Sequence, residues 1–289
     1  MKPAPFAYHR PATVDEATAL LHELGSEAKP LAGGQSLIPA MNFRLARPLA
    51  LVDLNRVREL DYLRHEPDGL RLGAMTRQRT VERSDDARRA APLIAEALPF
   101  VAHAQIRNRG TMGGSIAHAD PAAELPAVML ALEARFRVRG PAAERWIAAD
   151  AFFTGLFATA LAPDELLVEI VIPSRPARAG WAFAEVARRH GDYALAGVAA
   201  TLQLDDAGRC ATARIALFSV GDGPALAGRA AAVLVGQLPT GEAIHAAADA
   251  ASTEDIDPPS DIHASASYRR QLVRVLVGRV LPRAVERAT

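Results

Sequence analysis

Apolar residues in the first part of the chain recur at helical spacing and then form two short runs. The helical stretch lies between Thr13, which has a glutamate three residues later in the capping-box pattern, and Gly25, a residue typical of helix ends. AKPLAGG (28–34) predicts a short strand that runs into a loop. LALVDLN (49–55) is a continuous apolar run and predicts a buried strand parallel to the first. We therefore expect a small α/β unit here.

Short polar and apolar stretches alternate through the middle of the chain. GLRLGAMT (69–76) predicts a strand that bends at Gly73. The stretch 86–103 predicts helices interrupted at Pro92 and Pro99, because proline cannot continue a helix regularly.

A further helix and strand are expected after Gly113-Gly114, where we predict a turn. Pro121 suits the first position of that helix, which should run into the strand RFRV (135–138). ELLVEIVIP (165–173) has the clearest strand pattern of the middle part.

The last third of the chain changes from strand-like to helical patterns. Strands are predicted for GWAFAEVARR (180–189), AATLQLD (199–205) and RCATARIALFSVG (209–221). The sequence DDAG between the last two favours a hairpin. Three alanine-rich helical stretches follow, at 225–237, 241–252 and 267–288. These patterns predict a small antiparallel sheet with helices packed on it.

Composition narrows the class of protein. The chain has 289 residues, of which 50% are hydrophobic and 23% charged, so it can form two or three domains with large cores. Lys+Arg and Asp+Glu both count 33, and this balance gives no sign of nucleic-acid binding or of a basic membrane-binding patch. No apolar run reaches the roughly 18 residues of a membrane helix, and no signal-peptide pattern is visible, so we expect a cytoplasmic protein without a transmembrane segment.

Cysteine and histidine usage gives little sign of a metal site. Cys210 is the only cysteine, so neither an intramolecular disulfide nor an iron–sulfur cluster held by this chain alone is expected, since such a cluster normally takes four cysteines. Because Cys210 lies in a strand-like run, we expect it to be a small buried side chain. His103, His118 and His190 are too scattered to predict a metal site, and no metal ligand is assigned.

Two glycine pairs, each followed by a hydroxyl residue, are the strongest candidate chemistry. They lie in AGGQSL (32–37) and in RNRGTMGGSIAHADPAAELP (107–126). Glycine lets backbone N–H groups surround an anion, and Ser36, Thr111 and Ser115 add hydroxyl donors. Neither motif matches a dinucleotide or P-loop fingerprint. The residues alone leave two interpretations open, a cradle for a phosphate-bearing cofactor or a pair of ordinary turns.

A resemblance to a known family extends this interpretation. AGGQSL and TMGGSIAHADPAAELP resemble the two flavin-binding signatures of the FAD-binding (medium) subunits of molybdenum hydroxylases. This family includes carbon monoxide dehydrogenase and quinoline oxidoreductase medium chains and the FAD segment of xanthine dehydrogenase. The segments 6–25, 188–200 (with GDYA) and 265–284 are also similar to the family, so the resemblance covers essentially the whole chain.

The resemblance implies an α+β protein with a two-subdomain FAD-binding fold of the vanillyl-alcohol-oxidase (PCMH) type. A C-terminal domain of the CO dehydrogenase flavoprotein type, an antiparallel sheet with helices, would follow. The patterns above divide the chain correspondingly into 1–55, 56–177 and 178–289. The implied cofactor is noncovalent FAD, with its diphosphate and ribityl chain wrapped by the two motifs. The motif residues are Ala32, Gly33, Gly34, Gln35, Ser36 and Leu37, and Thr111, Met112, Gly113, Gly114 and Ser115.

Further residues take roles from the resemblance. It places Asp120 and Glu124 near the adenosine end of FAD, where a carboxylate accepts hydrogen bonds from ribose hydroxyls, and Tyr193 against the isoalloxazine ring. The alternatives are that Asp120 is a helix cap, that Glu124 is an ordinary acid at a helix N-terminus, and that Tyr193 is a core or interface residue. Some family members carry histidine where this chain has Gln35, and glutamine does not titrate near pH 7, so we expect no proton transfer there.

The function implied by the resemblance is electron transfer. No nucleophile–base arrangement is visible, so no catalytic residue is assigned, and FAD would carry the redox chemistry. Substrate would be hydroxylated at molybdopterin in a large subunit, and electrons would pass through [2Fe–2S] clusters of a small subunit to FAD and then to an external acceptor. The implied assembly is a dimer of heterotrimers. The alternatives are a stand-alone flavin oxidase of the same fold and a non-enzymatic scaffold.

Overall fold

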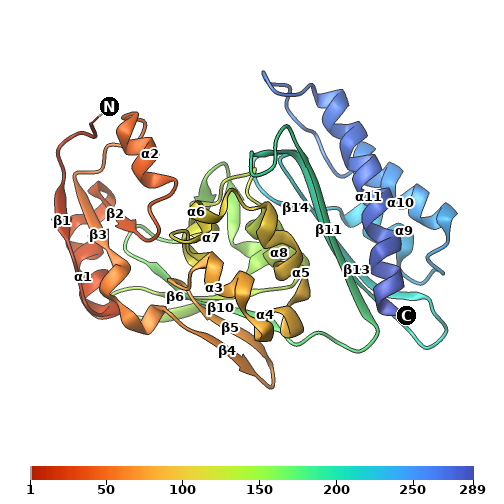
Figure 1. Cartoon of the computed structure of the whole chain (residues 1–289), viewed down its shortest axis with the longest axis horizontal. Helices are drawn as coiled ribbons and strands as arrows, with labels where there is room; N and C mark the ends of the chain where they lie inside the picture. Colours follow the sequence, from red (N-terminus) through yellow and green to blue (C-terminus); the bar gives the residue numbers. More distant parts are fainter. Residues whose placement is uncertain (1) are drawn as a thin grey trace.

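The computed structural model describes residues 2–289, and its main sheets follow one another along the long axis of the molecule (Figure 1). The first is a three-stranded parallel sheet in the order β1-β3-β2. Its elements are β1 (Ala7–His9), α1 (Val14–Leu24), β2 (Ala28–Leu31), α2 (Leu37–Asn42) and β3 (Ala50–Asp53). The parallel, buried β3 and the limits of α1, with Thr13 as N-cap and Gly25 as C-cap, are as predicted.

The second sheet is five-stranded and antiparallel, in the order β4-β5-β10-β6-β7. Its strands are β4 (Leu63–Glu66), β5 (Gly69–Gly73), β6 (Arg135–Arg139), β7 (Glu144–Ala148) and β10 (Leu166–Pro173). The helices with it are α3 (Gln78–Arg83), α4 (Asp85–Ala90), α5 (Pro92–Ala97), α6 (Ala104–Arg107), α7 (Met112–His118) and α8 (Glu124–Ala131). A two-stranded hairpin, β8 (Phe153–Gly155) and β9 (Ala158–Thr159), lies beside it.

The third sheet is four-stranded and antiparallel, in the order β11-β12-β13-β14. Its strands are β11 (Ala179–Ala187), β12 (Ala194–Leu204), β13 (Cys210–Phe218) and β14 (Ala225–Leu226). The helices that follow are α9 (Gly228–Leu234), α10 (Gly241–Thr253) and α11 (Ala266–Ala288). This architecture confirms the predicted α+β class, the β12–β13 hairpin and the buried position of Cys210. Each sheet lies within one of the ranges 1–55, 56–177 and 178–289, which we propose as domain limits.

The third sheet is apolar on both faces, because alternate residues of a strand point to opposite sides. Phe183 and Phe218 belong to the core that α5 and α8 share with the second sheet. Ala182 and Val198 belong to a separate core with α10 and α11. A backbone hydrogen bond from Ser219 N–H to the Pro121 carbonyl adds a polar contact between the two regions. The sheet is therefore packed against a different layer on each side (Figure 1).

Three local predictions are wrong. Gly113 and Gly114 lie inside α7 and not in a turn, because the Thr111 hydroxyl caps that helix. The next helix begins at Glu124 and not at Pro121, because the Asp120 carboxylate accepts a hydrogen bond from Ala122 N–H and closes a separate turn first. The start of the first alanine-rich stretch forms the short strand β14, which pairs with β13. By contrast, helices break at Pro92 and Pro99 as predicted.

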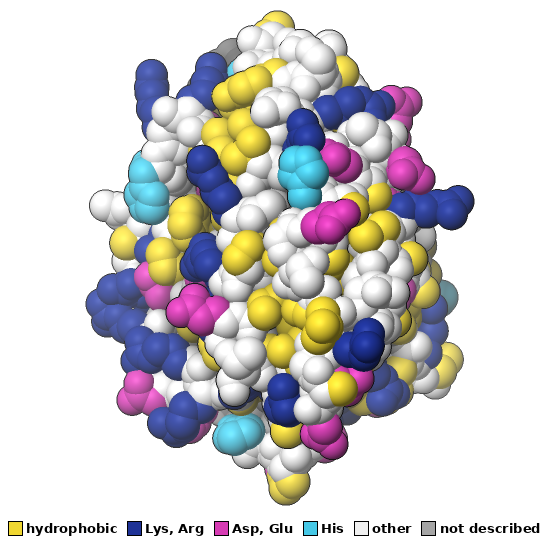
Figure 2. All heavy atoms as spheres, turned by 90° about the vertical axis from the view of Figure 1, so that its right-hand side faces the viewer, with side chains coloured by type: hydrophobic (Ala, Val, Ile, Leu, Met, Phe, Trp, Pro, Cys, Tyr) yellow, Lys and Arg dark blue, Asp and Glu magenta, His cyan; other side chains and the backbone are white. Residues whose placement is uncertain are grey.

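The outer surface mixes charges of both signs. Figure 2 looks onto the end formed by the C-terminal helices, where basic, acidic and apolar side chains are interspersed. Across residues 2–289, no helix combines the length and the hydropathy needed to cross a membrane.

A buried ion pair fixes the segment that leads into the second glycine motif. Arg107, only 6% exposed, donates through Nε and Nη2 to the two carboxylate oxygens of Glu82, at 3.0 and 2.9 Å. Its Nη1 donates to the carbonyls of Val101 and Ala102 at 2.9 and 3.0 Å. The bidentate geometry is the strong form of this interaction. Arg107 thus ties α6 to α3 and holds the loop before Thr111 in place.

We expect Arg107→Ala to lower the free energy of unfolding by roughly 3 kcal/mol, because it leaves the partly buried Glu82 without its bidentate partner. Arg79, which also pairs with Glu82 at 2.8 Å, limits the loss. Arg88→Ala is the control, since its pair with Asp85 is exposed and should contribute little to stability. Urea unfolding measures both variants, and equal losses would contradict the structural role of Arg107.

Candidate functional site

The two glycine motifs, about eighty residues apart in sequence, are in direct contact. A Cβ added to Gly33 would lie 2.4 Å from the carbonyl oxygen of Arg109 and 2.8 Å from the Cα of Gly110. A Cβ added to Gly114 would lie 3.4 Å from the methyl group of Ala32. The first distance is shorter than real Cβ contacts, so only glycine permits this backbone-to-backbone approach. The motifs therefore form one site.

The first motif leaves hydrogen-bond donors available. Gly34 has φ +73°, in the left-handed region, and the loop is held by Gln35 Nε2 donating to the Gly33 carbonyl at 3.0 Å and by Asn55 Nδ2 donating to the Ala32 carbonyl at 3.0 Å. Within residues 2–289, no hydrogen bond uses the backbone N–H groups of residues 33–36 or the Ser36 hydroxyl. These groups are free to donate to a ligand.

The second motif mostly satisfies its own backbone. Met112 and Gly113 N–H donate to the carbonyls of Thr76 and Ala74, each at 2.9 Å. Gly114 N–H donates to the Thr111 hydroxyl at 3.0 Å, and Ser115 N–H donates to the Thr111 carbonyl at 3.2 Å. The backbone N–H groups of residues 112–115 are therefore already used within the protein, unlike those of residues 33–36. The second motif supplies a rigid wall and the Ser115 hydroxyl, which has no partner among the described residues.

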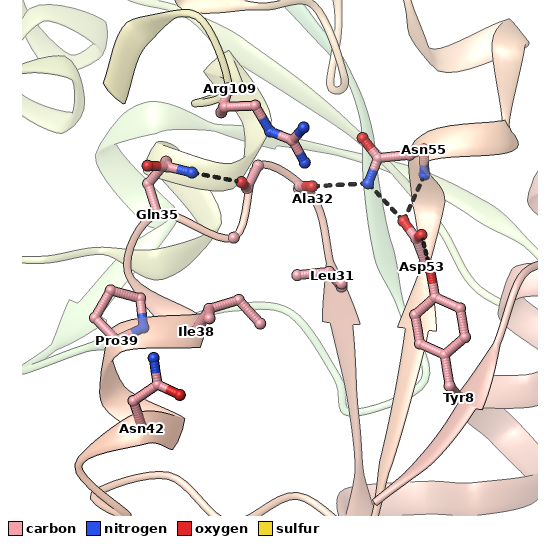
Figure 3. Close-up of a pocket in the computed structure, with 12 residues that line it drawn as sticks. Tyr8, Leu31, Ala32, Gln35, Ile38, Pro39, Asn42, Asp53, Asn55 and Arg109 are labelled. Carbon is pink, nitrogen blue, oxygen red and sulfur yellow. Dashed lines mark hydrogen bonds between the residues drawn. The ribbon is translucent and has the colours of Figure 1, made fainter. Parts of the chain in front are cut away.

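A cavity of about 440 Å³ opens beside the first motif (Figure 3). It lies between loop 31–35, the start of α2 and the ends of β1 and β3. Its lining residues are Tyr8, Leu31, Ala32, Gly33, Gly34, Gln35, Ile38, Pro39, Asn42, Asp53, Asn55 and Arg109. Volume and mixed polarity are within the range of small-molecule sites.

A network of hydrogen bonds organises the polar side of this cavity. Tyr8 donates through its hydroxyl to the Asp53 carboxylate, and Asn55 N–H donates to the same carboxylate at 2.9 Å (Figure 3). Burial opposes ionisation of Asp53, but these hydrogen bonds outweigh it and hold the pKa of that carboxyl below its usual value. Asp53 is therefore ionised at neutral pH and keeps Tyr8 and Asn55 in fixed positions.

A second group of titratable residues lies outside the cavity lining. Glu124, the first residue of α8, is 7% exposed, and burial raises its pKa to about 7. Glu185, on β11, has its pKa raised to about 8, first by burial and then by the negative charge of Glu124. The Oε2 atom of Glu185 is buried and has no hydrogen-bond partner within residues 2–289. The two acids therefore lie near each other where α8 packs on the third sheet.

Tyr193 lies next to this group, at the end of the loop that joins β11 to β12. The side chain is 65% exposed, and partial burial of its hydroxyl and the charges of Asp120 and Glu124 raise its pKa. The loop rests on the region before the second motif, since a Cβ added to Gly191 would lie 2.7 Å from the His103 ring. Tyr193 is thus an accessible aromatic residue and not part of the core.

The structure brings some predicted site residues together and separates others. Ala32, Gly33, Gly34 and Gln35 line the cavity, Ser36 and Leu37 follow at α2, and residues 111–115 lie across the loop contact. Asp120 and Glu124 lie beside Tyr193 and do not line the cavity. Adenosine and isoalloxazine occupy opposite ends of an extended FAD. Asp120 and Glu124 were expected to contact adenosine, and Tyr193 was expected to contact the isoalloxazine ring. Because the three residues lie side by side, both expectations can hold only if FAD folds back on itself.

The sequence did not single out several residues of the site, namely Tyr8, Asn42, Asp53, Asn55, Arg77, Arg109 and Glu185. Asp53 and Asn55 carried a usable signal, because they are polar residues at the end of a buried parallel strand, where ligands of α/β sheets bind. Glu185 carried none, since one acid in an apolar strand is ordinary. Within the described residues, no group of three or more His, Cys, Asp or Glu side chains is arranged to hold a metal ion.

Comparisons with known proteins define the class. Residues 4–175 match the model of the FAD binding domain in molybdopterin dehydrogenase, and residues 181–284 match that of the CO dehydrogenase flavoprotein C-terminal domain. The protein is therefore a flavoprotein with a molybdopterin-dehydrogenase type of FAD-binding domain, as the glycine motifs predicted. The chain belongs to the family of FAD-binding medium subunits of molybdenum hydroxylases and is an oxidoreductase subunit.

Similarity extends over whole chains. The chain is 42% identical over 288 residues to 6-hydroxypseudooxynicotine dehydrogenase complex subunit alpha of Paenarthrobacter nicotinovorans, covering 100% of this chain and 97% of that one. It is 42% identical to a chain of the carbon monoxide dehydrogenase structure from Hydrogenophaga pseudoflava, with a TM-score of 0.97 and full coverage of both chains. It is 38% identical to a chain of quinoline 2-oxidoreductase from Pseudomonas putida 86, with a TM-score of 0.93, and the match covers 100% of this chain and 99% of that one.

The Glu124–Glu185 pair predicts a pH dependence of stability. Because the folded state raises both pKa values above their ordinary value near 4.5, it binds more protons than the unfolded chain between about pH 4.5 and 8. The contribution of the pair to stability is therefore present at low pH and is lost as the pH rises through that window. We expect Glu185→Gln to be more stable relative to wild type at pH 8.5 than at pH 5.5, by at least about 1.4 kcal/mol, the value of one pKa unit.

Urea unfolding at the two pH values measures this difference. Glu254→Gln, at an exposed position just after α10, is the matched control and should show none. If the stability difference between Glu185→Gln and wild type did not change with pH, the raised pKa of Glu185 in the folded state would be contradicted.

Proposed function

We propose that this protein binds FAD noncovalently and acts as the electron-transfer subunit of a molybdenum hydroxylase complex. Electrons would arrive from [2Fe–2S] clusters of a partner and leave FAD to an external acceptor. The observation that carries the proposal is the direct contact of the two glycine motifs beside free N–H groups and a cavity. Neither ordinary turns nor a scaffold function requires that arrangement.

The residues present fit FAD in a specific way. The N–H groups of residues 33–36 and the hydroxyls of Ser36 and Ser115 would donate to the diphosphate oxygens, and a loop without side chains lets them approach. Thr111, Met112, Gly113 and Gly114 would form the wall that holds the first motif in place. FAD, when bound, supplies the ability to take up electrons singly and release them as a pair.

Tyr193 and its neighbours suit the ring end of the cofactor. An exposed aromatic side chain whose loop packs on His103 offers a flat surface for stacking. Burial raises the pKa of Glu124 to about 7, so near neutral pH its protonated form is populated and would donate a hydrogen bond rather than only accept one. Asp120, whose carboxylate accepts from Ala122 N–H, would shape the turn beneath Tyr193.

The electron donor would be another polypeptide. The buried thiol of Cys210 is the only cysteine, so this chain cannot ligate a cluster by itself. The relatives include a dehydrogenase complex subunit and carbon monoxide dehydrogenase medium chains, which favours a subunit over a stand-alone oxidase. We propose an iron–sulfur small subunit and a molybdopterin large subunit as partners, assembled as a dimer of heterotrimers in the cytoplasm.

We expect the purified protein, alone or with its partners, to contain or take up FAD. Tyr193→Ala should keep FAD but shift the flavin absorption spectrum and midpoint potential, because the ring loses its stacking surface while the diphosphate donors remain. Tyr268→Ala, a half-exposed tyrosine on α11, is the control and should change neither. Absence of FAD binding would contradict the proposed function. An unchanged flavin spectrum in Tyr193→Ala would show that Tyr193 does not contact the isoalloxazine ring.

The partner assignment is tested by expression with the two presumed partner subunits. We expect the three chains to co-elute with iron and molybdenum, through an interface of at least about 1,000 Å² in total. Substrate of the large subunit should then reduce the FAD. Reduction of FAD in the lone chain by a small substrate at a useful rate, without iron or molybdenum, would favour the stand-alone oxidase.

A further inference from the structure

Arg269, in the first turn of α11, is a buried arginine that joins three segments of the C-terminal region. It is only 5% exposed. Its Nη1 donates to the carbonyls of Leu195 and Ser219, at 2.5 and 2.7 Å. Its Nη2 donates to the Asp261 carboxylate at 2.6 Å, in the loop before α11. The start of β12, the end of β13 and the loop before α11 therefore meet at one guanidinium group.

The contact with Leu195 brings Arg269 close to the loop that carries Tyr193. Leu195 follows Tyr193 by two residues, at the start of β12. A Cβ added to Gly180, at the start of β11, would lie 1.7 Å from the carbonyl oxygen of Ala284, near the end of α11. Helix and strand thus run in opposite directions, and α11 begins at the end of the third sheet where the β11–β12 loop lies (Figure 1).

The contact with Ser219 extends to the turn before α8. Ser219, whose carbonyl accepts from Arg269, donates through its N–H to the Pro121 carbonyl at 2.8 Å. Pro121 lies in the turn that the Asp120 carboxylate closes by accepting from Ala122 N–H at 2.9 Å. A single residue therefore connects Arg269 to the turn that contains Asp120, which lies beside Tyr193.

This connection contains features that destabilise the folded state. Ser219 has φ +62°, in the left-handed region that residues with a side chain rarely adopt. Ser219 Oγ and Arg269 Nε are both buried and have no hydrogen-bond partner in the part of the chain that the structure describes, residues 2–289. Left-handed backbone and unpaired buried polar atoms are typical of functional sites, where other constraints outweigh local stability. Stability alone therefore does not account for this arrangement.

The next residue, Arg270, makes the same kinds of contact at a different place. It donates through Nη1 to the carbonyls of Ser252 and Ile256, at 3.1 and 2.7 Å, and through Nη2 to the Asp257 carboxylate at 2.8 Å. These partners lie at the end of α10 and in the loop that follows it. None of them belongs to the β11–β12 loop or to the turn before α8. The two arginines therefore have equal hydrogen-bonding chemistry but hold different segments.

We propose that Arg269 is a positioning residue of the flavin site, which fixes Tyr193 relative to the turn that contains Asp120. Because Arg269 is buried, it acts through Leu195 and Ser219 and not by contact with the cofactor. The inference rests on the proposed function, since that function places Tyr193 at the isoalloxazine ring. It gives the C-terminal region a role in setting the properties of the flavin.

Arg269→Lys tests this in the full-length protein, because lysine keeps the charge but lacks the planar group that reaches two carbonyls and a carboxylate together. We expect FAD to be retained with a Kd within threefold of wild type. The flavin spectrum and midpoint potential should shift in the same direction as in Tyr193→Ala. The double variant should have the potential of Tyr193→Ala alone, because both changes act on one stacking contact. Arg270→Lys is the matched control and should change neither spectrum nor potential.

Hydrogen exchange of the protein freed of flavin gives a measurement that needs no cofactor. Backbone amides of residues 192–198 should exchange at least tenfold faster in Arg269→Lys than in wild type, and at the wild-type rate in Arg270→Lys. Asp261→Asn covers a folding defect of Arg269→Lys, since it removes only the acceptor for Nη2 and should give a smaller shift of the potential in the same direction.

An unchanged spectrum and potential in folded Arg269→Lys, or in Asp261→Asn if Arg269→Lys does not fold, would overturn the positioning role. Equal effects of Arg269→Lys and Arg270→Lys on potential or exchange would also overturn it, because both would then report general loosening of α11. These outcomes leave FAD binding by the wild-type protein intact, whereas wild-type protein that binds no FAD would refute the proposed function.

Discussion

The backbone contact between Gly33 and the Arg109–Gly110 peptide is the constraint on which the site depends. It joins a loop of the parallel sheet to a segment of the antiparallel sheet at a distance that no side chain permits. The Arg107–Glu82 ion pair and the Arg77 hydrogen bonds hold one side of this contact, and the Asn55 hydrogen bond to Ala32 holds the other. The free N–H groups of the first motif therefore lie beside a backbone segment that is held in a fixed position.

The two motifs, similar in sequence, differ in role. The first motif is an irregular loop whose amides remain free, whereas the second is the capped start of a helix whose amides are used internally. A short sequence pattern of glycines and hydroxyls does not distinguish these cases. The distinction comes from Thr111 and from Ala74, which lies close enough to Gly113 to exclude a side chain there.

Sequence patterns predicted the fold well because its elements have strong local signals. The capped helix α1, the apolar β3 and β10, and the β12–β13 hairpin follow from periodicity and turn residues. The family and the cofactor class followed from the motifs. Glu185, Arg77 and Tyr8 could not be predicted, because their roles depend on neighbours between 22 and 61 positions away, Asn55, Asp53 and Glu124. Such pairings are set by tertiary packing and leave no trace in a local pattern.

The two-faced third sheet has a consequence for how this polypeptide can be divided. One side of β11–β13 completes the core beneath α5 and α8, and the other supports α10 and α11. A fragment ending near Pro173 would leave the aromatic and aliphatic residues around α5 and α8 open to water and prone to self-association. The FAD-binding region and the C-terminal region thus match separate family models, but they share a hydrophobic core and should not be stable in water apart. Gene fusion, truncation or tag insertion must therefore preserve the chain as one folding unit.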